Sequence, residues 1–181
     1  VRDLTAAEAV IQCSLTGHKV LTTFHTEDAT GALLRLMDMG VNTFLISSTV
    51  VSVVAQRLVR TLCDYCKEPH DPSAALISAF NIKQDGLQTY QFYKESGCAH
   101  CNYTGFAGRV GIHEHMLVNE ALRDAILSRQ TSSQIKVVAR NINNMVNIHE
   151  DGFYKAATGI TTLEEVMRVA FLSPSMDISP R

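Results

Sequence analysis

The sequence predicts an α/β fold in which a small metal-binding segment interrupts a larger domain and helices follow near the C-terminus. The first observation is an alternation of segments with strand character and segments in which apolar residues recur with helical spacing. The second is a pair of C-x-x-C motifs within residues 63–108, where prolines, glycines and tyrosines replace the apolar pattern. The chain has 181 residues, which is enough to bury a hydrophobic core.

Composition narrows the class of protein. Hydrophobic residues make up 46% of the chain, which is typical of a folded domain. The 16 basic and 18 acidic residues give a net charge of −2, so nucleic acid is not an expected partner. The longest apolar run, residues 44–55, has 12 residues and is too short to cross a bilayer. No signal-peptide pattern is visible, and we expect a cytoplasmic protein whose cysteines bind metal rather than form disulfides.

The first helix is expected from about Ala6 to Leu15. Thr5 and Glu8 have the spacing of a capping box, and Gly17 is suited to follow the end of a helix. Cys13 lies within this apolar segment. We therefore expect it to be a small buried side chain.

Three further elements are expected in the N-terminal part. Lys19–Phe24 has the composition of a buried strand. Apolar residues at helical spacing then predict a helix that begins near Glu27 and ends at Gly40. Residues 44–59 are expected to form a third helix that passes into a short extended stretch.

A metal-binding module and a helical part are predicted for the remainder of the chain. The module spans residues 63–108 and is expected to contain a helix at about Pro72–Phe80. A strand follows at Arg109–Val118. Further helices are expected at about 120–128, 132–139 and 143–157, and another begins at the capping box Thr162–Glu165. The tail, residues 171–181, contains two prolines and is expected to be disordered.

The four paired cysteines are expected to bind one zinc ion. Each C-x-x-C motif lets two sulfurs face the same ion, and two such turns complete a tetrahedron of thiolates. Because protein occupies all four positions, the ion would have a structural role. Iron in the same cage and a redox or disulfide role are the alternatives, and His100, inside the second motif, is expected to be exposed. The ligands would be Cys63, Cys66, Cys98 and Cys101.

His25 raises the question of a functional site, because it stands between the predicted strand and a helix that starts near Thr26. A histidine at a strand end is most often a structural hydrogen-bonding residue. In open α/β sheets, however, ligands bind beyond the carboxyl ends of the strands, where helix N-termini offer free amides. An imidazole at this position can bind a phosphate oxygen or a neighbouring catalytic group.

Several segments resemble, in order, the motifs of the ATPases that power type II secretion and type IV pilus assembly. The first is V-R-D-L-T-A-A-E (1–8), which is similar to the residues just past their Walker B strand. The second is L-T-G-H-K-V-L-T-T-F-H-T-E-D-A (15–29), which resembles their histidine box. Further matches are A-Q-R-L-V-R-T-L-C (55–63), G-C-A-H-C-N-Y-T-G-F-A-G-R-V-G-I-H-E (97–114) and G-I-T-T-L-E-E-V-M-R-V (159–169). The tetracysteine motif is usual in the extension and secretion members of that family.

The resemblance implies that the chain is the C-terminal part of a RecA-like three-layer domain, with a tetracysteine zinc-binding insertion and a helical C-terminal subdomain. Residues 1–62 would belong to the RecA-like core after Walker B and would carry the histidine box. Residues 63–108 would be the metal module. Residues 109–170 would form a strand and the helical subdomain, before the tail at 171–181.

The resemblance also implies roles for three residues. His25 and Thr26 would lie near the γ-phosphate of ATP, and Arg2 is a further candidate for stabilising charge there. The chain contains no Gly-Lys pair and therefore no phosphate-binding loop. ATP and Mg²⁺ are expected only in the full-length enzyme, and this chain is expected to be inactive alone.

The implied partners are further copies of the chain in a hexameric ring and inner-membrane platform or secretion and pilus assembly proteins. They would hold the protein at the cytoplasmic side of the inner membrane. The alternative function is a zinc-ribbon adaptor that binds nucleic acid or protein without catalysis, through Tyr65, Tyr103 and Phe106. Residues 63–108 contain no basic cluster, which argues against nucleic acid.

Two pairs of polar residues are expected to face solvent. Arg57 and Arg60 are interpreted as a solvated face, with a role at a ring interface as the alternative. His113 and His115 alternate along a strand and are expected to be exposed.

Overall fold

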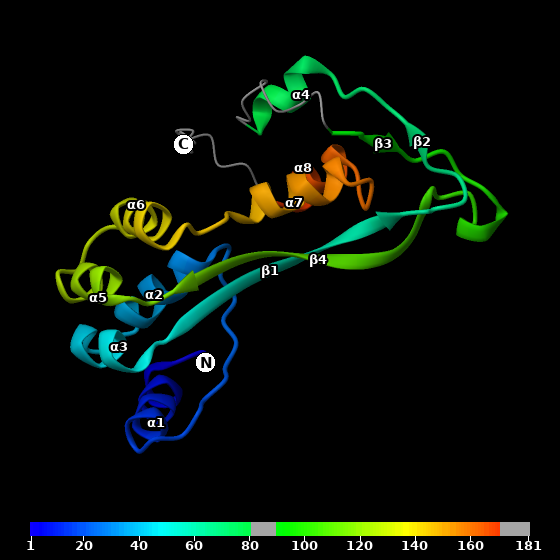
Figure 1. Cartoon of the computed structure of the whole chain (residues 1–181). Coiled ribbons are helices and arrows are strands. Elements are labelled where there is room, and N and C mark those ends of the chain that lie inside the picture. The colour runs from blue at the N-terminus through cyan, green and yellow to red at the C-terminus, as the bar shows by residue number, and fades with distance from the viewer. Residues whose placement is uncertain (81–89, 171–181) are drawn as a thin grey trace. The chain divides into compact units, whose positions relative to one another are not determined.

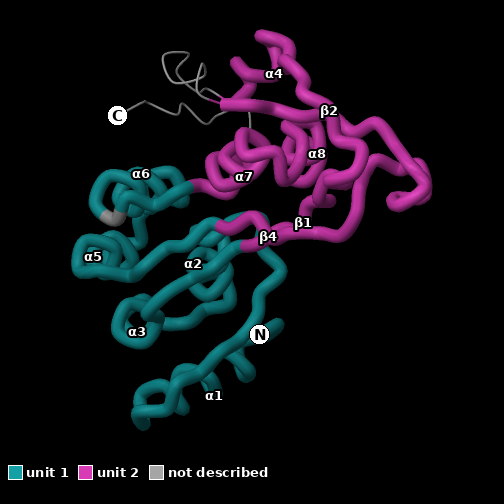
Figure 2. The backbone as a smooth tube through the Cα atoms, turned by 45° about the vertical axis from the view of Figure 1, so that its right-hand side comes forward, with its two compact units in different colours: residues 1–55, 114–146 teal, residues 56–113, 147–181 magenta. Residues whose placement is uncertain are grey.

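A computed structural model describes residues 1–80 and 90–170. The predicted disordered tail, residues 171–181, lies outside the described residues. The chain divides into two compact units (Figure 2): unit 1 comprises residues 1–55 and 114–146, and unit 2 comprises residues 56–113 and 147–181. The units interleave along the sequence. The division into consecutive domains made above remains a prediction.

The described residues form a mixed α/β structure (Figure 1), as predicted. β1 and β4 pair in one two-stranded sheet and run in opposite directions in Figure 1. β2 and β3 form a second, antiparallel pair, in which Glu68 lies opposite Lys94. The strands are β1 (Ser52–Leu62), β2 (Glu68–Pro69), β3 (Tyr93–Lys94) and β4 (Phe106–Leu117), and a 3-10 turn, η2, spans Ala99–Cys101. The helices are α1 (Leu4–Leu15), α2 (Ala29–Asp38), α3 (Thr43–Thr49), α4 (Ala74–Ala79), α5 (Glu120–Leu127), α6 (Ser132–Asn143), α7 (Ile148–Ala157) and α8 (Leu163–Val169).

Unit 1 is built around one hydrophobic cluster. Helix α5 packs against α3 and α6, and α6 also packs against α2. Burying one leucine, isoleucine or methionine side chain contributes roughly 1.5–3 kcal/mol to the stability of the fold, relative to leaving it exposed. The cluster includes the fully buried residues Leu33, Ile46, Met116, Leu122 and Ile135.

Unit 2 has its own cluster, centred on the aromatic side chain of Phe153. Its ring contacts those of Phe80 and Phe92, with centroids 5.9 Å and 5.6 Å away. Helices α7 and α8 approach closely at Gly152, where a Cβ atom would lie 2.4 Å from Cγ1 of Val166. Glycine is therefore required there for α8 to pack against α7.

Strand β4 alternates along its C-terminal half as a half-buried strand should. Ile112, Glu114 and Met116 are buried, whereas His113 and His115 are exposed. The predicted exposure of the two histidines is confirmed. The inward position of a glutamate between two apolar residues was not predicted.

The structure corrects the expected start of α1 and the environment of Cys13. The helix begins at Leu4, because the carboxylate of Asp3 accepts a hydrogen bond from the amide of Ala6 at 2.8 Å and is the N-cap instead of Thr5. Cys13 is exposed, not buried. It follows Ile11 on the buried face of α1 by two residues, about 200° around the helix.

Four other expected elements are also corrected. Lys19–Phe24 is not a strand, because the described part of the chain supplies no neighbouring strand for it, and Leu21 is 99% exposed. The third helix ends at Thr49, because Val50 and Val51 favour an extended chain and lead into the long strand β1, which begins at Ser52. The helix expected to end at 139 continues to Asn143, where Asn144 in the left-handed conformation (φ 50°) ends α6, and the helix expected at 143–157 begins only at Ile148.

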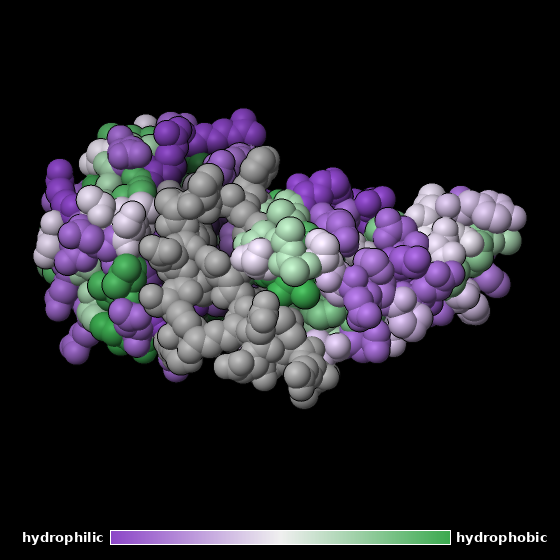
Figure 3. Space-filling view, turned by 90° about the horizontal axis from the view of Figure 1, so that it is seen from above, coloured by the Kyte–Doolittle hydropathy of each residue, from purple (hydrophilic) through white to green (hydrophobic). Residues whose placement is uncertain are grey.

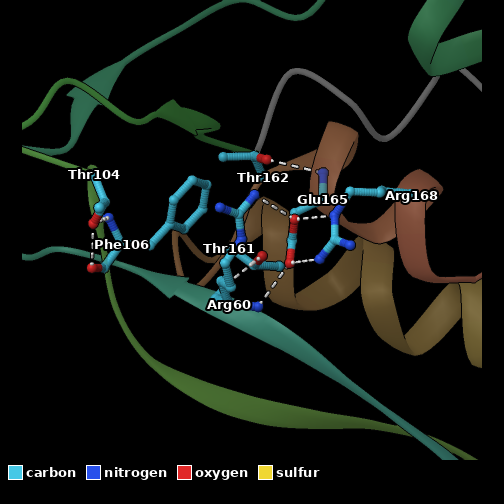
Figure 4. A network of polar contacts seen from close by, with 7 residues as sticks. All are labelled: Arg60, Thr104, Phe106, Thr161, Thr162, Glu165 and Arg168. Carbon is cyan, nitrogen blue, oxygen red and sulfur yellow. Dashed lines mark hydrogen bonds and ion pairs between the residues drawn. The ribbon is translucent and has the colours of Figure 1, made fainter.

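Residues 160–165 supply hydrogen-bond partners for backbone groups of β1 near its C-terminal end (Figure 4). The hydroxyl of Thr161 donates to the carbonyl of Arg60 at 2.8 Å, and the amide of Arg60 donates to Oε1 of Glu165 at 3.1 Å. The expected capping box is half formed, since the hydroxyl of Thr162 accepts from the amide of Glu165. The carboxylate of Glu165 is directed to the guanidinium groups of Arg60 and Arg168 instead.

Arg60 is therefore more than a solvated residue, although its side chain is 47% exposed. Its guanidinium lies 2.8 Å from Oε2 of the buried Glu165 and 4.0 Å from the centroid of the Phe106 ring. Burial alone raises the pKa of Glu165, but hydrogen bonds from Arg168 and Arg60 outweigh it and lower this pKa to about 2.

On the face shown in Figure 3, hydrophobic residues form separate patches among hydrophilic ones. Across residues 1–80 and 90–170, none of the helices has the length and apolar character needed to span a bilayer.

We predict that Glu165 makes unit 2 sensitive to acid. Its pKa is about 2 in the folded chain against an ordinary value of 4.5, so its stabilisation is present above about pH 4.5 and is lost as the pH falls toward 2. The urea midpoint of the wild type should therefore fall more steeply below about pH 5 than that of Glu165→Gln. Glu164→Gln, at the exposed neighbouring position, should follow the wild type. Equal slopes for wild type and Glu165→Gln would contradict the role of the network.

Candidate functional site

The two C-x-x-C motifs meet in unit 2. The sulfur of Cys63 lies 3.9 Å from that of Cys98, and the sulfur of Cys66 lies 3.8 Å from that of Cys101. The sulfurs of Cys98 and Cys101 are also 3.8 Å apart, and all four lie within 4.8 Å of one another. These separations are far longer than the 2.0 Å of a disulfide.

The backbone forms a tight turn at each motif. The amide of Cys66 donates to the carbonyl of Cys63 at 3.2 Å, and the amide of Cys101 donates to the carbonyl of Cys98 at the same distance. The second turn continues through Asn102 and Tyr103, which both have positive φ angles (51° and 61°). The turns direct the sulfurs of each pair to one point, as the two-residue spacers predict.

Backbone amides point at two of the sulfurs. Those of Cys98 and Gly105 donate to Sγ of Cys101, both at 3.2 Å, and that of Gly97 donates to Sγ of Cys66 at 3.3 Å. The amide of Cys98 contributes most to lowering the pKa of the Cys101 thiol to about 6, whereas burial raises that of Cys66 to about 12. Amide donors of this kind stabilise thiolates, the form in which cysteine binds metals.

The cluster fits a tetrahedral metal ion. With zinc–sulfur bonds of about 2.3 Å, tetrahedral geometry puts neighbouring sulfurs about 3.8 Å apart. The three sulfur pairs described above lie at 3.8–3.9 Å. His100 is exposed, as predicted, and its ring stacks on that of Tyr65 with centroids 4.1 Å apart.

The segment that carries His25 and Thr26 belongs to unit 1. Residues 18–26 form a coil that leads into α2, so the histidine precedes a helix but does not follow a strand. His25 is exposed and Thr26 is partly buried. The hydroxyl of Thr26 donates to the carbonyl of Asp28 at 3.1 Å, which draws the residue toward the helix start.

Carboxylates bind the first amides of α2. Asp28 is the N-cap, and its Oδ1 accepts from the amide of Gly31 at 2.7 Å. Oε1 of Glu114, on β4, accepts from the amide of Ala29 at 3.0 Å. Oδ2 of Asp28 also pairs with Nζ of Lys136 at 2.5 Å. The amides of Ala29 and Gly31 are thus bound within the protein, contrary to the expectation of free amides beside His25.

Arg2 is exposed and lies on a segment that runs beside the histidine segment. The backbone nitrogen of Val1 lies 2.9 Å from the carbonyl oxygen of Thr23. The structure thus brings the backbone before Arg2 against that before His25. Both belong to unit 1, whereas the four cysteines belong to unit 2.

Sequence reasoning missed Glu114 in this site. Glu114 stands between His113 and His115, the two exposed histidines of the strand. An acidic residue in phase with Ile112 and Met116 was the available signal, because alternate residues share a face. Its partner, 85 residues away in the sequence, was not available from any local pattern.

Comparison with known families identifies the chain. Residues 1–168 match the family described as "Type II/IV secretion system protein". The chain belongs to this family. The resemblance of the motifs is therefore confirmed over nearly the whole chain.

Curated relatives in this family carry specific names. "Type II secretion system ATPase E" of Vibrio cholerae is 45% identical over 169 residues, which cover 93% of this chain and 33% of the relative. "Type IV pilus assembly ATPase PilB" of Thermus thermophilus is 41% identical over 167 residues, which cover 92% of this chain and 19% of the relative. The chain thus spans a third or less of the length of these relatives.

Solved structures show the same fold. The pilus retraction motor PilT, solved with bound ADP, has a TM-score of 0.60 and 20% identity, and the match covers 96% of this chain and 38% of PilT. The ATPase DotB of Legionella pneumophila has a TM-score of 0.55 and 20% identity, and the match covers 93% of this chain and 36% of DotB. The predicted fold, the C-terminal part of a RecA-like α/β domain with a tetracysteine insertion, is confirmed.

Proposed function

We propose that the chain is the C-terminal part of an ATPase that powers type II protein secretion or type IV pilus assembly. The supporting observation is the family match over residues 1–168, together with 45% identity to a relative named type II secretion system ATPase E. In the full-length enzyme, ATP hydrolysis would be coupled to motion of this domain. A zinc-ribbon adaptor has no observation of its own in its favour.

The whole protein would act as a hexameric ring. Its partners would be an inner-membrane platform and the secretion or pilus assembly proteins attached to it, on the cytoplasmic side of that membrane. ATP and Mg²⁺ would bind with the help of a phosphate-binding loop that this chain does not contain, since its sequence has no Gly-Lys pair.

His25 and Thr26 would contact the γ-phosphate of ATP from the coil before α2. The exposure of His25 leaves its ring accessible to a nucleotide held by another part of the enzyme. Its imidazole would donate a hydrogen bond to a phosphate oxygen when that group is correctly placed. Arg2, also exposed, would add positive charge on the neighbouring segment.

The four cysteines would hold a structural Zn²⁺. Zinc suits this cluster because it accepts four thiolates in a tetrahedron and is inert to oxidation and reduction. Since protein supplies all four ligands, the ion would have no open position for water. It would link the end of β1 to the start of β4, which flank the two motifs in sequence.

We predict one zinc ion per chain. Cys98→Ser should release the ion and loosen residues 63–108, because the free energy of metal binding stabilises the folded state of this module. Helices α5 and α6, which belong to unit 1, should persist. Elemental analysis after dialysis and circular dichroism measure the two effects. Cys13→Ser, at an exposed cysteine outside the cluster, should retain the ion. Wild-type protein without any bound metal would exclude the proposed site.

We predict that the 181-residue chain alone does not hydrolyse ATP, because it lacks the loop that cradles the phosphates. Phosphate release by the purified chain should equal the background without protein. Turnover above background that disappears in His25→Ala would show that this chain can act without a phosphate-binding loop.

In the full-length enzyme, His25→Ala should lower kcat and leave the Kd for ATP nearly unchanged. One hydrogen bond to the transferred phosphate, worth about 1–3 kcal/mol, corresponds to about a 5- to 150-fold loss of turnover. A bond formed only near the transition state affects kcat rather than binding. His115→Ala, at an exposed histidine on β4, is the matched control. An unchanged kcat would return His25 to a structural role.

A further inference from the structure

Glu114 is a carboxylate in a place where the sequence pattern calls for an apolar residue. It is 2% exposed and shares the buried face of β4 with Ile112 and Met116. Burying a charged carboxylate is costly unless hydrogen bonds compensate for the lost water. A leucine or isoleucine would fill this position without that cost. The presence of a glutamate therefore points to a role for its acceptor oxygens.

The acceptor oxygen binds the first turn of α2. Oε1 of Glu114 lies 3.0 Å from the amide nitrogen of Ala29, the first residue of that helix. The first amides of a helix have no partner within the helix, and the positive end of the helix dipole favours a carboxylate beside them. Glu114 thus fixes the point at which the chain enters α2.

The same short segment carries the candidate site residues. Ala29 is three residues after Thr26 and four after His25. The carbonyl of Asp28 accepts from the hydroxyl of Thr26, and the carboxylate of Asp28 accepts from the amide of Gly31 at 2.7 Å. These bonds hold residues 26–31 together as one segment. The hydrogen bond from Ala29 to Glu114 attaches that segment to β4.

The contact with Glu114 joins this segment to a buried residue of β4, because the amide of Ala29 donates to a carboxylate on a residue that is 2% exposed. A second long-range contact, between Asp28 and Lys136, involves partly exposed side chains (23% and 27%) and is more easily screened by solvent. Glu114 is therefore better placed than Lys136 to restrict the position of the segment.

We propose that Glu114 is a positioning residue for His25 and Thr26. By accepting the hydrogen bond of Ala29, it holds the segment before α2 where His25 meets the γ-phosphate. This proposal rests on the function proposed for His25 above. It requires an acceptor oxygen at residue 114 and does not require that residue to touch the nucleotide.

The test compares two substitutions in the full-length enzyme. Glu114→Gln keeps an acceptor oxygen of the same reach and removes the charge. Glu114→Met keeps the length of the side chain and removes the strong acceptor. Asn42→Ala removes the side-chain acceptor for the amide of Phe44 at the start of α3, in the same unit, and serves as a control for a lost helix cap.

The expected result is a split between the variants. Glu114→Met should lose about tenfold or more in kcat with the Kd for ATP unchanged, whereas Glu114→Gln should stay within about threefold of the wild type. Asn42→Ala should keep the wild-type kcat. In the Glu114→Met variant, the amide of Ala29 should exchange with deuterium faster than in the wild type, which reports the lost bond without any measure of activity.

A double-mutant cycle with His25→Ala separates this proposal from the proposed function. If Glu114 acts through His25, Glu114→Met should change kcat little in the His25→Ala background. A full kcat in His25→Ala alone refutes the function proposed for the histidine. A large effect of His25→Ala with none of Glu114→Met refutes only the role of Glu114. If Glu114→Met does not fold, a tenfold loss of kcat in a Glu114→Gln variant of unchanged Tm overturns the proposal.

Discussion

The pairing of β1 with β4 is the constraint on which the rest of the structure depends. Met116 belongs to the core of unit 1, and Val59 and Ile112 belong to the core of unit 2. Because alternate residues of a strand share a face, the alternation along β4 turns Ile112 and Met116 to its buried side. A slip of one residue would turn Glu114 outward and His113 inward. The register thus determines both the packing and the position of the charged groups.

Two buried glutamates perform the same physical task in different units. Glu114 accepts from a backbone amide 85 residues away in the sequence, and Glu165 accepts from one 105 residues away. In both cases a side-chain oxygen accepts the hydrogen bond of a backbone amide and so joins two segments that are distant in the sequence. Glu165 is compensated by the guanidinium groups of Arg60 and Arg168. A hydrophobic residue at either position would keep the burial and lose the attachment.

The features that could be predicted from the sequence are those determined by residues close to one another in the chain. The cysteine spacing predicted the sulfur cluster, and helical periodicity predicted α2 and α5, because each pattern acts over a few residues. The strand expected at Lys19–Phe24 failed because strand formation depends on a partner elsewhere in the chain. The contact between Glu114 and α2 was not predictable for the same reason, and the roles of His25, Thr26 and Arg2 stay predictions.

The cysteine cluster also bears on how the segment between the motifs can vary among related chains. Cys66 and Cys98 are separated by 31 residues, and the cluster fixes the two ends of that loop. The entropy lost on closing a loop grows only with the logarithm of its length, so a loop twice as long would cost about 0.6 kcal/mol more. Phe80 and Phe92, which belong to this loop, pack against Phe153 in the core of unit 2. The length of the loop can therefore vary at little cost only where these core contacts are kept, while the two-residue spacers set the positions of the sulfurs.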